Sequence, residues 1–393
     1  MTPGNGEPPG SPEAPGALTA TEVAEAGSID YPMVNEEVEA GAVPLSQRLR
    51  NPRAIISIVL PIVVLLLVLT ALPGFHLDQL PTLILNANPW WLLAAVGIYY
   101  IGFPLRGYRW ALLIRGTGYP LKTRDATEII FISWLVNCVV PAKLGDVYRG
   151  YLLRVTAMVA LSTSFGTIFI ERIFDLFAIV ILGLMAGFWS FRTNMPESVR
   201  IIFGLGLIVV AVLAVGLFVV RNFGRNILER LPVPHRFVAM YDLFEQGVFS
   251  VERRKLPVIA VITALVWTTE ALRLYFVVLA LHFPGVDLGI SGAFFVALTA
   301  SLLTAIPFTP AGVGIVEGGM IFLLVRIYSV DQTQAAAIVL LDRVISVLSI
   351  IVLGSIVYVV SSKTKSGGRL ATTMQSPTAA AGAPKAPTGP ASA

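Results

Sequence analysis

The sequence predicts an all-α polytopic membrane protein with six full spans and two re-entrant helical hairpins in an inverted-topology repeat, with both termini cytoplasmic. Three observations support this fold class. The chain of 393 residues is 55% hydrophobic and 13% charged, whereas a soluble domain contains about 25% charged residues. Lys and Arg gather in particular loops, and one Pro/Gly motif occurs twice within apolar surroundings.

The membrane region is expected at 47–361, between two polar tails. Residues 1–46 contain eight acidic residues and no Lys or Arg, and they lack the basic start and short apolar run of a signal peptide. Such a composition buries too little apolar surface to offset the entropy of ordering, so this segment is expected to be a disordered acidic cytoplasmic tail. Residues 362–393, rich in Ala, Pro and Thr, are expected to be a second disordered cytoplasmic tail.

Apolar stretches of the length that spans a bilayer, about 20 residues, recur along the membrane region. They are 54–72, 90–113, 164–188, 201–220, 257–281 and 335–360. Two further apolar stretches, 126–140 and 291–308, are each followed by a Pro/Gly break and a second, partly apolar helix. These stretches predict hairpins at 126–159 and 291–328.

The distribution of basic residues orients the spans, because Lys and Arg are enriched in cytoplasmic loops. Three Arg residues precede the first span, and 221–255 carries seven basic residues, so both segments are predicted to be cytoplasmic. The loops 73–89 and 282–290 carry none and are predicted to lie outside. Six spans satisfy this pattern if each hairpin returns to its own side, the first entering from the cytoplasm and the second from outside.

The alternative is that each hairpin consists of two full spans, which leaves the loop orientation unchanged. In that case Asp146, Arg149 and Arg154 would lie across the hydrocarbon. Broken, charged backbone is tolerated at membrane depth where protein or a water-filled cavity covers it. This favours re-entrant hairpins.

The two hairpins carry similar motifs. The segment 141-PAKLGDV-147 aligns with 310-PAGVGIV-316 at Pro, Ala, Gly and Val. Arginines flank both copies at similar distances: Arg106, Arg172, Arg273 and Arg343. Residues 90–188 and 257–360 therefore form two units of span, hairpin and span, and the span at 201–220 makes the second unit start from the opposite face. Inverted repeats with broken helices are typical of transporters with a site near the bilayer midplane.

Ionisable residues inside spans are costly unless paired or hydrated, so each is a candidate functional residue. Arg offers a planar fork for phosphate, Lys a point charge, and helix N-termini offer free N–H groups. The candidate substrate-binding residues are Asn137, Pro141, Lys143, Gly145, Asp146, Arg149, Glu171, Arg172, Asp175, Arg273, Pro310, Gly312, Gly314, Glu317, Asp342 and Arg343. Lys143 and Arg149 are expected to meet the phosphate of an anionic lipid headgroup.

The charged residues allow a functional and a purely structural interpretation. In the functional interpretation, the carboxylates orient the cations or carry protons in coupled transport. Alternatively, Glu171–Arg172 and Asp342–Arg343 pair across the repeat to lock the fold, and the Pro/Gly breaks simply turn the hairpins. Arg106 and Arg109 could extend to the cytoplasmic interface as snorkelling side chains.

Sequence motifs for enzymes are absent from the chain. It contains no H-E-x-x-H, P-loop, G-x-S-x-G or D-x-D motif and no cofactor signature. The single Cys138 excludes an intrachain disulfide. We therefore expect no enzyme activity, cofactor or metal, and a membrane lipid rather than a nucleic acid as the partner. An envelope-lipid synthesising enzyme and a second copy of the chain remain open as further partners.

Four motifs in order are similar to those of a known family. The segments 137-NCVVPAKLGDVYR-149, 171-ERIFD-175, 307-PFTPAGVGIVE-317 and 342-DR-343 together resemble the lysylphosphatidylglycerol synthase transmembrane-domain family, also called flippase-like. The resemblance covers about 50–360, the whole predicted membrane region.

The resemblance implies a function in lipid transport. In bifunctional synthases that carry this domain, the membrane part resembles a flippase for aminoacylated phospholipid, and a separate soluble domain makes that lipid. We expect this chain to be a stand-alone member without the synthase domain, located in the cell membrane. The leading expectation is a lipid translocator. The alternatives are an accessory membrane protein for envelope-lipid biosynthesis and an intramembrane transferase with a lipid-linked donor.

Overall fold

The structure is a computed structural model that describes residues 77–140, 143–230, 235–303, 312–361 and 363. These residues form helices and connecting turns without a β-strand. The predicted span at 54–72 and the tail at 1–46 lie outside the described residues, as does nearly all of the tail at 362–393.

The helices follow the order that the sequence predicts, with two additions. Their bounds are η1 Leu77–Gln79, α5 Leu80–Leu85, α6 Pro89–Gly116, α7 Thr123–Val139, α8 Leu144–Ala157, α9 Leu161–Ser190, α10 Glu197–Arg230, α11 His235–Val248, η2 Arg253–Lys255, α12 Leu256–Leu281, α13 Gly289–Leu303, α14 Ile315–Arg326, α15 Gln332–Arg343, the π-helical turn η4 Val344–Leu348 and α16 Ser349–Val360. The last three elements form one continuous helix.

Long apolar helices make this a polytopic membrane protein. Among the described residues, Glu197–Arg225, Arg253–Leu281 and Gln332–Val360 are long and apolar enough to cross a bilayer. Helices α6 and α9 have 28 and 30 residues, which also exceeds the length a span needs. Both contain buried charged residues.

The helix breaks occur at the predicted Pro/Gly motifs. α7 ends at Val139 and α8 begins at Leu144, while α13 ends at Leu303 and α14 begins at Ile315. Lys143, directly before α8, has a left-handed φ of 53°, a conformation that residues other than glycine rarely adopt. Gly312, which aligns with Lys143 in the repeated motif, has a φ of 72°. The two copies of the motif therefore share an unusual backbone turn.

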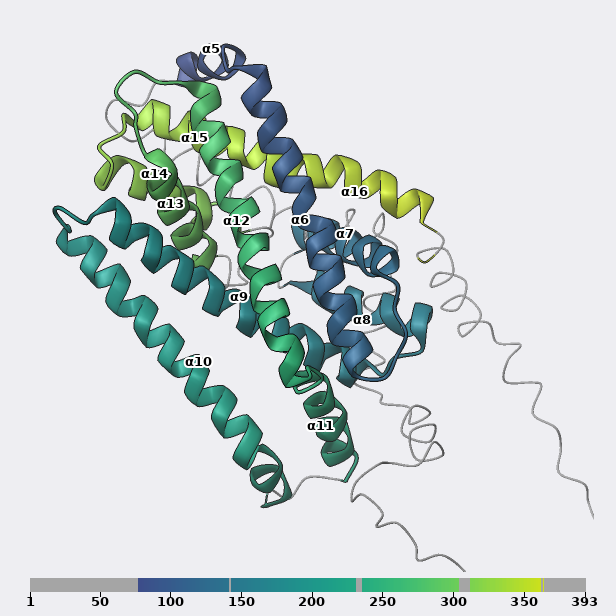
Figure 1. Cartoon of the computed structure of the whole chain (residues 1–393). Coiled ribbons are helices and arrows are strands. Elements are labelled where there is room, and N and C mark those ends of the chain that lie inside the picture. The colour runs from purple at the N-terminus through teal and green to yellow at the C-terminus, as the bar shows by residue number, and fades with distance from the viewer. Residues whose placement is uncertain (1–76, 141–142, 231–234, 304–311, 362, 364–393) are drawn as a thin grey trace, which may run out of the picture.

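Corresponding helices of the two units pack in equivalent ways (Figure 1). α6 and α12 lie side by side and antiparallel, since the N–H of Asn88 at the start of α6 donates to the carbonyl of Ala280 near the end of α12, at 2.8 Å. α9 of the first unit packs on α13 of the second, and α16 of the second unit packs on α7 of the first.

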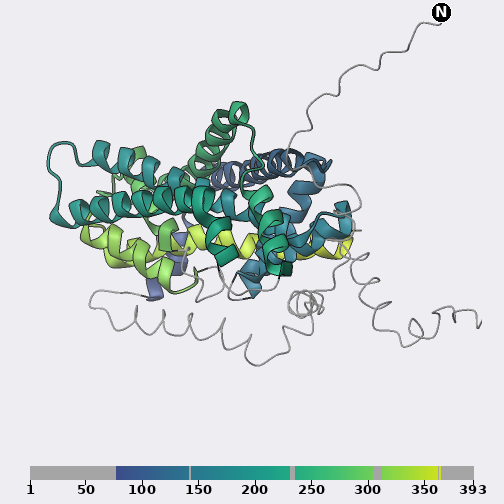
Figure 2. The ribbon, with the colours of Figure 1, turned by 90° about the horizontal axis from the view of Figure 1, so that it is seen from below.

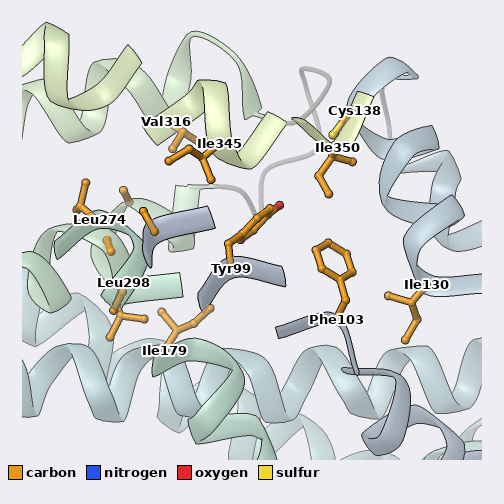
Figure 3. Packing of buried hydrophobic residues seen from close by; sticks show 14 of the residues in the cluster. Tyr99, Phe103, Ile130, Cys138, Ile179, Leu274, Leu298, Val316, Ile345 and Ile350 are labelled. Carbon is orange, nitrogen blue, oxygen red and sulfur yellow. The ribbon is translucent and has the colours of Figure 1, made fainter. Parts of the chain in front are cut away.

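A single hydrophobic core joins the two units. Figure 3 shows Tyr99 and Phe103 of α6 surrounded by residues from both units, including Ile130 and Leu274. The Tyr99 side chain is fully buried, and its hydroxyl donates to the carbonyl of Ser346 at 2.9 Å. The centre of the molecule is therefore shared by helices that are far apart in the sequence.

The predicted cytoplasmic segment 221–255 contains a helix that the sequence analysis missed. This helix, α11, packs against α9, whereas most side chains of α10 before it are exposed along the outside of the bundle (Figures 1 and 2). The contact depends on glycine, because a Cβ added at Gly166 would lie only 2.1 Å from the Phe244 carbonyl oxygen. The short α5 was also not predicted.

Candidate functional site

A cavity of about 180 Å³ lies between the two helix breaks, the middles of α6 and α12, and the end of α15 with the π-helical turn that follows it. Seven of the predicted site residues line it: Asn137, Lys143, Arg172, Arg273, Gly312, Asp342 and Arg343. Of the lining side chains, four are basic and two, Glu270 and Asp342, are acidic. The cavity thus brings residues of both units together and favours a ligand with negative charge.

Two similar ion pairs connect α9 to α8 and α15 to α14. In the first unit, Arg172 Nη2 of α9 lies 2.8 Å from Asp146 Oδ1 of α8. In the second unit, Arg343 Nε of α15 lies 3.0 Å from Glu317 Oε1 of α14. Both arginines line the cavity, whereas neither carboxylate is among its lining residues. Each carboxylate therefore holds a cavity arginine in place.

A second layer of charge in the first unit is almost fully buried. Glu171 Oε2 accepts from Arg149 Nη2 at 2.6 Å, and Glu171 Oε1 lies 3.1 Å from Arg109 Nη2. Arg109 also donates to Asp175 Oδ1 at 2.6 Å. The Arg149 guanidinium stacks on Trp110, 3.8 Å from the ring centroid. Arg149 does not line the cavity, and its charge is neutralised by Glu171.

The corresponding charges of the second unit lie in the cavity wall. Arg273 Nε donates to Asp342 Oδ1 at 2.8 Å, and Arg273 also pairs with Glu270. Glu270 in turn accepts from Arg106 Nη2 of the first unit at 2.5 Å. Arg106 and Arg109 are 4% and 1% exposed, so the snorkelling interpretation of these two residues is wrong.

The ion pairs differ from the structural alternative considered above. Glu171 and Asp342 pair with arginines of their own units. Arg343 likewise pairs with a carboxylate of its own unit, that of Glu317. An ion pair that does cross between the units is Arg106–Glu270.

Asn137 and Gly145 fix the first helix break. The Gly145 N–H donates to Asn137 Oδ1 at 2.8 Å, and the Ser133 hydroxyl donates to the Gly145 carbonyl at 2.8 Å. A Cβ at Gly145 would lie 2.2 Å from the Ser133 carbonyl oxygen, so only glycine fits. In the second break, the Gly314 N–H donates to Glu317 Oε2 at 2.6 Å. Pro141 and Pro310 lie outside the described residues.

Lys143 differs from the other cations of the cavity. It is half-buried and lines the cavity, and its side chain forms no ion pair or hydrogen bond with any residue that the structure describes. Its ammonium group is therefore available to a ligand.

The aromatic part of the cavity wall was missed by the sequence analysis. Tyr99, Trp134 and Trp267 line the cavity together with Glu270. Helical spacing could have predicted Trp267 and Glu270 as site residues, because they lie six and three residues from the predicted Arg273 and share one face of α12 with it.

The described residues form long apolar helices with a basic cavity between two helix breaks. These features are those of a polytopic integral membrane protein. The family described as "Lysylphosphatidylglycerol synthase TM region" matches residues 55–354, and the chain belongs to this family. Within residues that the structure describes, no group of three or more His, Cys, Asp or Glu side chains could hold a metal ion.

Relatives include several archaeal membrane proteins. A UPF0104 membrane protein of Methanocaldococcus jannaschii is 36% identical over 225 residues, which cover 57% of this chain and 92% of the relative. A UPF0104 membrane protein of Methanothermobacter thermautotrophicus is 26% identical over 68% of this chain and 82% of its own length. Glycosyltransferase AglD of Haloferax volcanii is 27% identical over 295 residues, which cover 66% of this chain but 47% of AglD.

Proposed function

We propose that the protein is a lipid translocator that moves an anionic phospholipid or a polyprenyl-phosphate-type lipid between leaflets. The observation that carries this proposal is the cavity between the two helix breaks, lined by Lys143, Arg172, Arg273 and Arg343. Arginine and lysine are the side chains that bind phosphate oxygens in proteins, through forked hydrogen bonds and a point charge respectively.

The proposed membrane arrangement has six spans and two re-entrant hairpins in an inverted repeat, with cytoplasmic termini. At 1.5 Å per residue, the 14 residues of α8 and the 12 residues of α14 extend for about 21 Å and about 18 Å. Both lengths fall short of the hydrocarbon core of about 30 Å, which supports half-spans. The antiparallel neighbours α6 and α12 support the inverted relation of the units, and such repeats bind substrate near the midplane.

Within this proposal Lys143, Arg172 and Arg343 contact the headgroup. Arg149 has a different role from the one expected from the sequence, because Glu171 and Trp110 enclose its guanidinium away from the cavity. We assign Arg149 to the framework that supports the site.

Transbilayer movement in proteoliposomes tests the proposal. Purified protein is reconstituted with a trace of a phospholipid labelled on its acyl chain, and a membrane-impermeant quencher reports the fraction that reaches the outer leaflet. We expect movement of at least one anionic lipid well above that in protein-free vesicles. Rates equal to those of empty vesicles across anionic phospholipids and polyprenyl phosphates would contradict the proposal.

An intramembrane transferase with a lipid-linked donor is the second candidate, favoured by the similarity to a protein named as a glycosyltransferase. This function requires a product whose formation depends on a chemical group at the site. Incubation with a labelled lipid-linked donor would then give a product with the natural sequence and none with Asp146→Asn. Movement of the lipid without any new covalent product would favour translocation.

A further inference from the structure

The ionised groups in the core of the molecule form a closed set with one exception. Six arginines and six carboxylates pair with one another within 4 Å. The arginines are Arg106, Arg109, Arg149, Arg172, Arg273 and Arg343, and the carboxylates are Asp146, Glu171, Asp175, Glu270, Glu317 and Asp342. Their charges cancel in number, so this set is neutral as a whole.

Lys143 is the seventh cation, and no described carboxylate pairs with it. The segments that precede Lys143 and Gly312 in the sequence and lie outside the described residues, 141–142 and 304–311, contain no acidic residue. The cavity and its supporting network therefore hold an excess of one positive charge, which is located in the cavity wall.

The backbone at Lys143 indicates that this charge is placed there against conformational preference. The aligned position in the second hairpin is Gly312, and both residues have a positive φ. Glycine adopts this conformation without the steric conflict that a Cβ causes. The first hairpin thus has a strained lysine where the second has an unstrained glycine, and the excess charge comes from this difference between the two units.

We infer that the cavity selects a headgroup with one net negative charge, which makes an anionic phosphodiester lipid, without a cationic group in its headgroup, the preferred substrate class. This inference rests on the proposed translocation. A phosphodiester carries a single charge that neutralises Lys143, whereas a phosphomonoester carries about 1.5 to 2 negative charges at pH 7 and a diphosphate more. A net charge left over in a partly buried site is unfavourable. Phosphodiesters occur both in glycerophospholipids and in glycosyl phosphoryl polyprenols.

The charge count can be changed in both directions by substitution. Lys143→Gly removes the excess and also relieves the backbone strain, so this variant should be at least as stable as the natural protein. Glu317→Gln raises the excess to two and keeps an acceptor for the Gly314 N–H. Glu252→Gln removes a carboxylate from an exposed pair outside the cavity, leaves the excess at one and serves as the matched control.

The experiment compares three acyl-labelled probes in proteoliposomes: phosphatidylglycerol, phosphatidic acid and phosphatidylcholine. We expect the natural protein to move phosphatidylglycerol at least about tenfold faster than phosphatidic acid at pH 8, since a mismatch of one charge at close range in a protein is worth more than that factor. Lowering the pH to 5 brings phosphatidic acid close to one charge, because the second pKa of a phosphomonoester is about 6 or above, and should remove most of the difference.

The variants give the decisive comparison. Lys143→Gly should lose the preference for phosphatidylglycerol over phosphatidylcholine, and Glu317→Gln should shift the preference towards phosphatidic acid. The control Glu252→Gln should keep the natural order. A glycosyl phosphoryl polyprenol, added as a fourth probe, distinguishes the two sources of phosphodiester. Movement of lipids with ratios that the variants do not change would overturn the inference and leave translocation standing. Absence of movement for every probe would instead overturn translocation.

Discussion

Replacing Glu171 by Gln is expected to lower the free energy of unfolding by about 3–5 kcal/mol, the range found when one partner of a buried ion pair is removed. The Glu171 carboxylate contacts both Arg149 and Arg109, and all three side chains are at most 4% exposed. Arginine stays charged in proteins, so the substitution leaves two buried guanidinium groups with less compensation. Unfolding in detergent micelles, followed by tryptophan fluorescence against temperature or denaturant, measures the loss.

Glu252→Gln is the matched control for this substitution. Glu252 pairs with Lys255 in the exposed turn before α12, and water solvates both side chains when the pair is lost. This variant should unfold like the natural protein. If Glu171→Gln also unfolds like the natural protein, the buried arginines do not depend on Glu171, and the supporting network described above is wrong.

Filling the cavity is expected to have the largest effect on lipid movement. Ala300 of α13 lines the cavity and is buried, and Ala300→Phe would place an aromatic ring in a space of about 180 Å³. We expect lipid movement to fall by at least about tenfold, equivalent to about 1.4 kcal/mol in the barrier, since the headgroup can no longer enter. The proteoliposome assay with labelled phosphatidylglycerol measures this.

The control for added volume is Ala211→Phe on α10, where the side chain is exposed. This variant should move lipid at the natural rate. Both variants are compared by their unfolding transitions, so that a loss of movement is read only from folded protein. A folded Ala300→Phe variant that moves lipid at the natural rate would show that the substrate takes another route.

The helix breaks were predictable because Pro and Gly act locally. α7 ends at Val139, just before Pro141, and α14 begins directly after Gly314, as the repeated motif predicts. The alignment of the two motifs also predicts that Lys143 and Gly312 occupy equivalent positions, and both have a positive φ. These features depend on the backbone preferences of single residues, which follow from residue identity alone.

The ion pairs were less predictable because tertiary packing decides them. Glu171 and Arg172 are neighbours in the sequence, but successive side chains of a helix point about 100° apart. Glu171 consequently faces Arg149 and Arg109, and Arg172 faces Asp146. Most charged residues of the site were predictable from the sequence, with Glu270 as an exception, but their partners were not. The expectation that Arg149 meets the phosphate differs from the structure for this reason, because Arg149 pairs with Glu171 instead.

The aromatic wall and the cross-unit contact depend on long-range packing. Arg106 meets Glu270 across 164 positions of the chain, and Tyr99 reaches the carbonyl of Ser346 across 247. No local pattern predicts such contacts from one sequence. The packing of α6 against α12 brings Arg106 to Glu270.

Photochemical labelling by a lipid tests the central claim most directly. A phospholipid with a phosphodiester headgroup that carries a diazirine is incorporated with the protein into liposomes and irradiated, and peptides are then analysed by mass spectrometry. The account predicts adducts on cavity residues such as Trp134, Asn137 and Met320, and their suppression by excess unlabelled phosphatidylglycerol. Adducts confined to the exposed face of α10, with none on cavity residues, would contradict it.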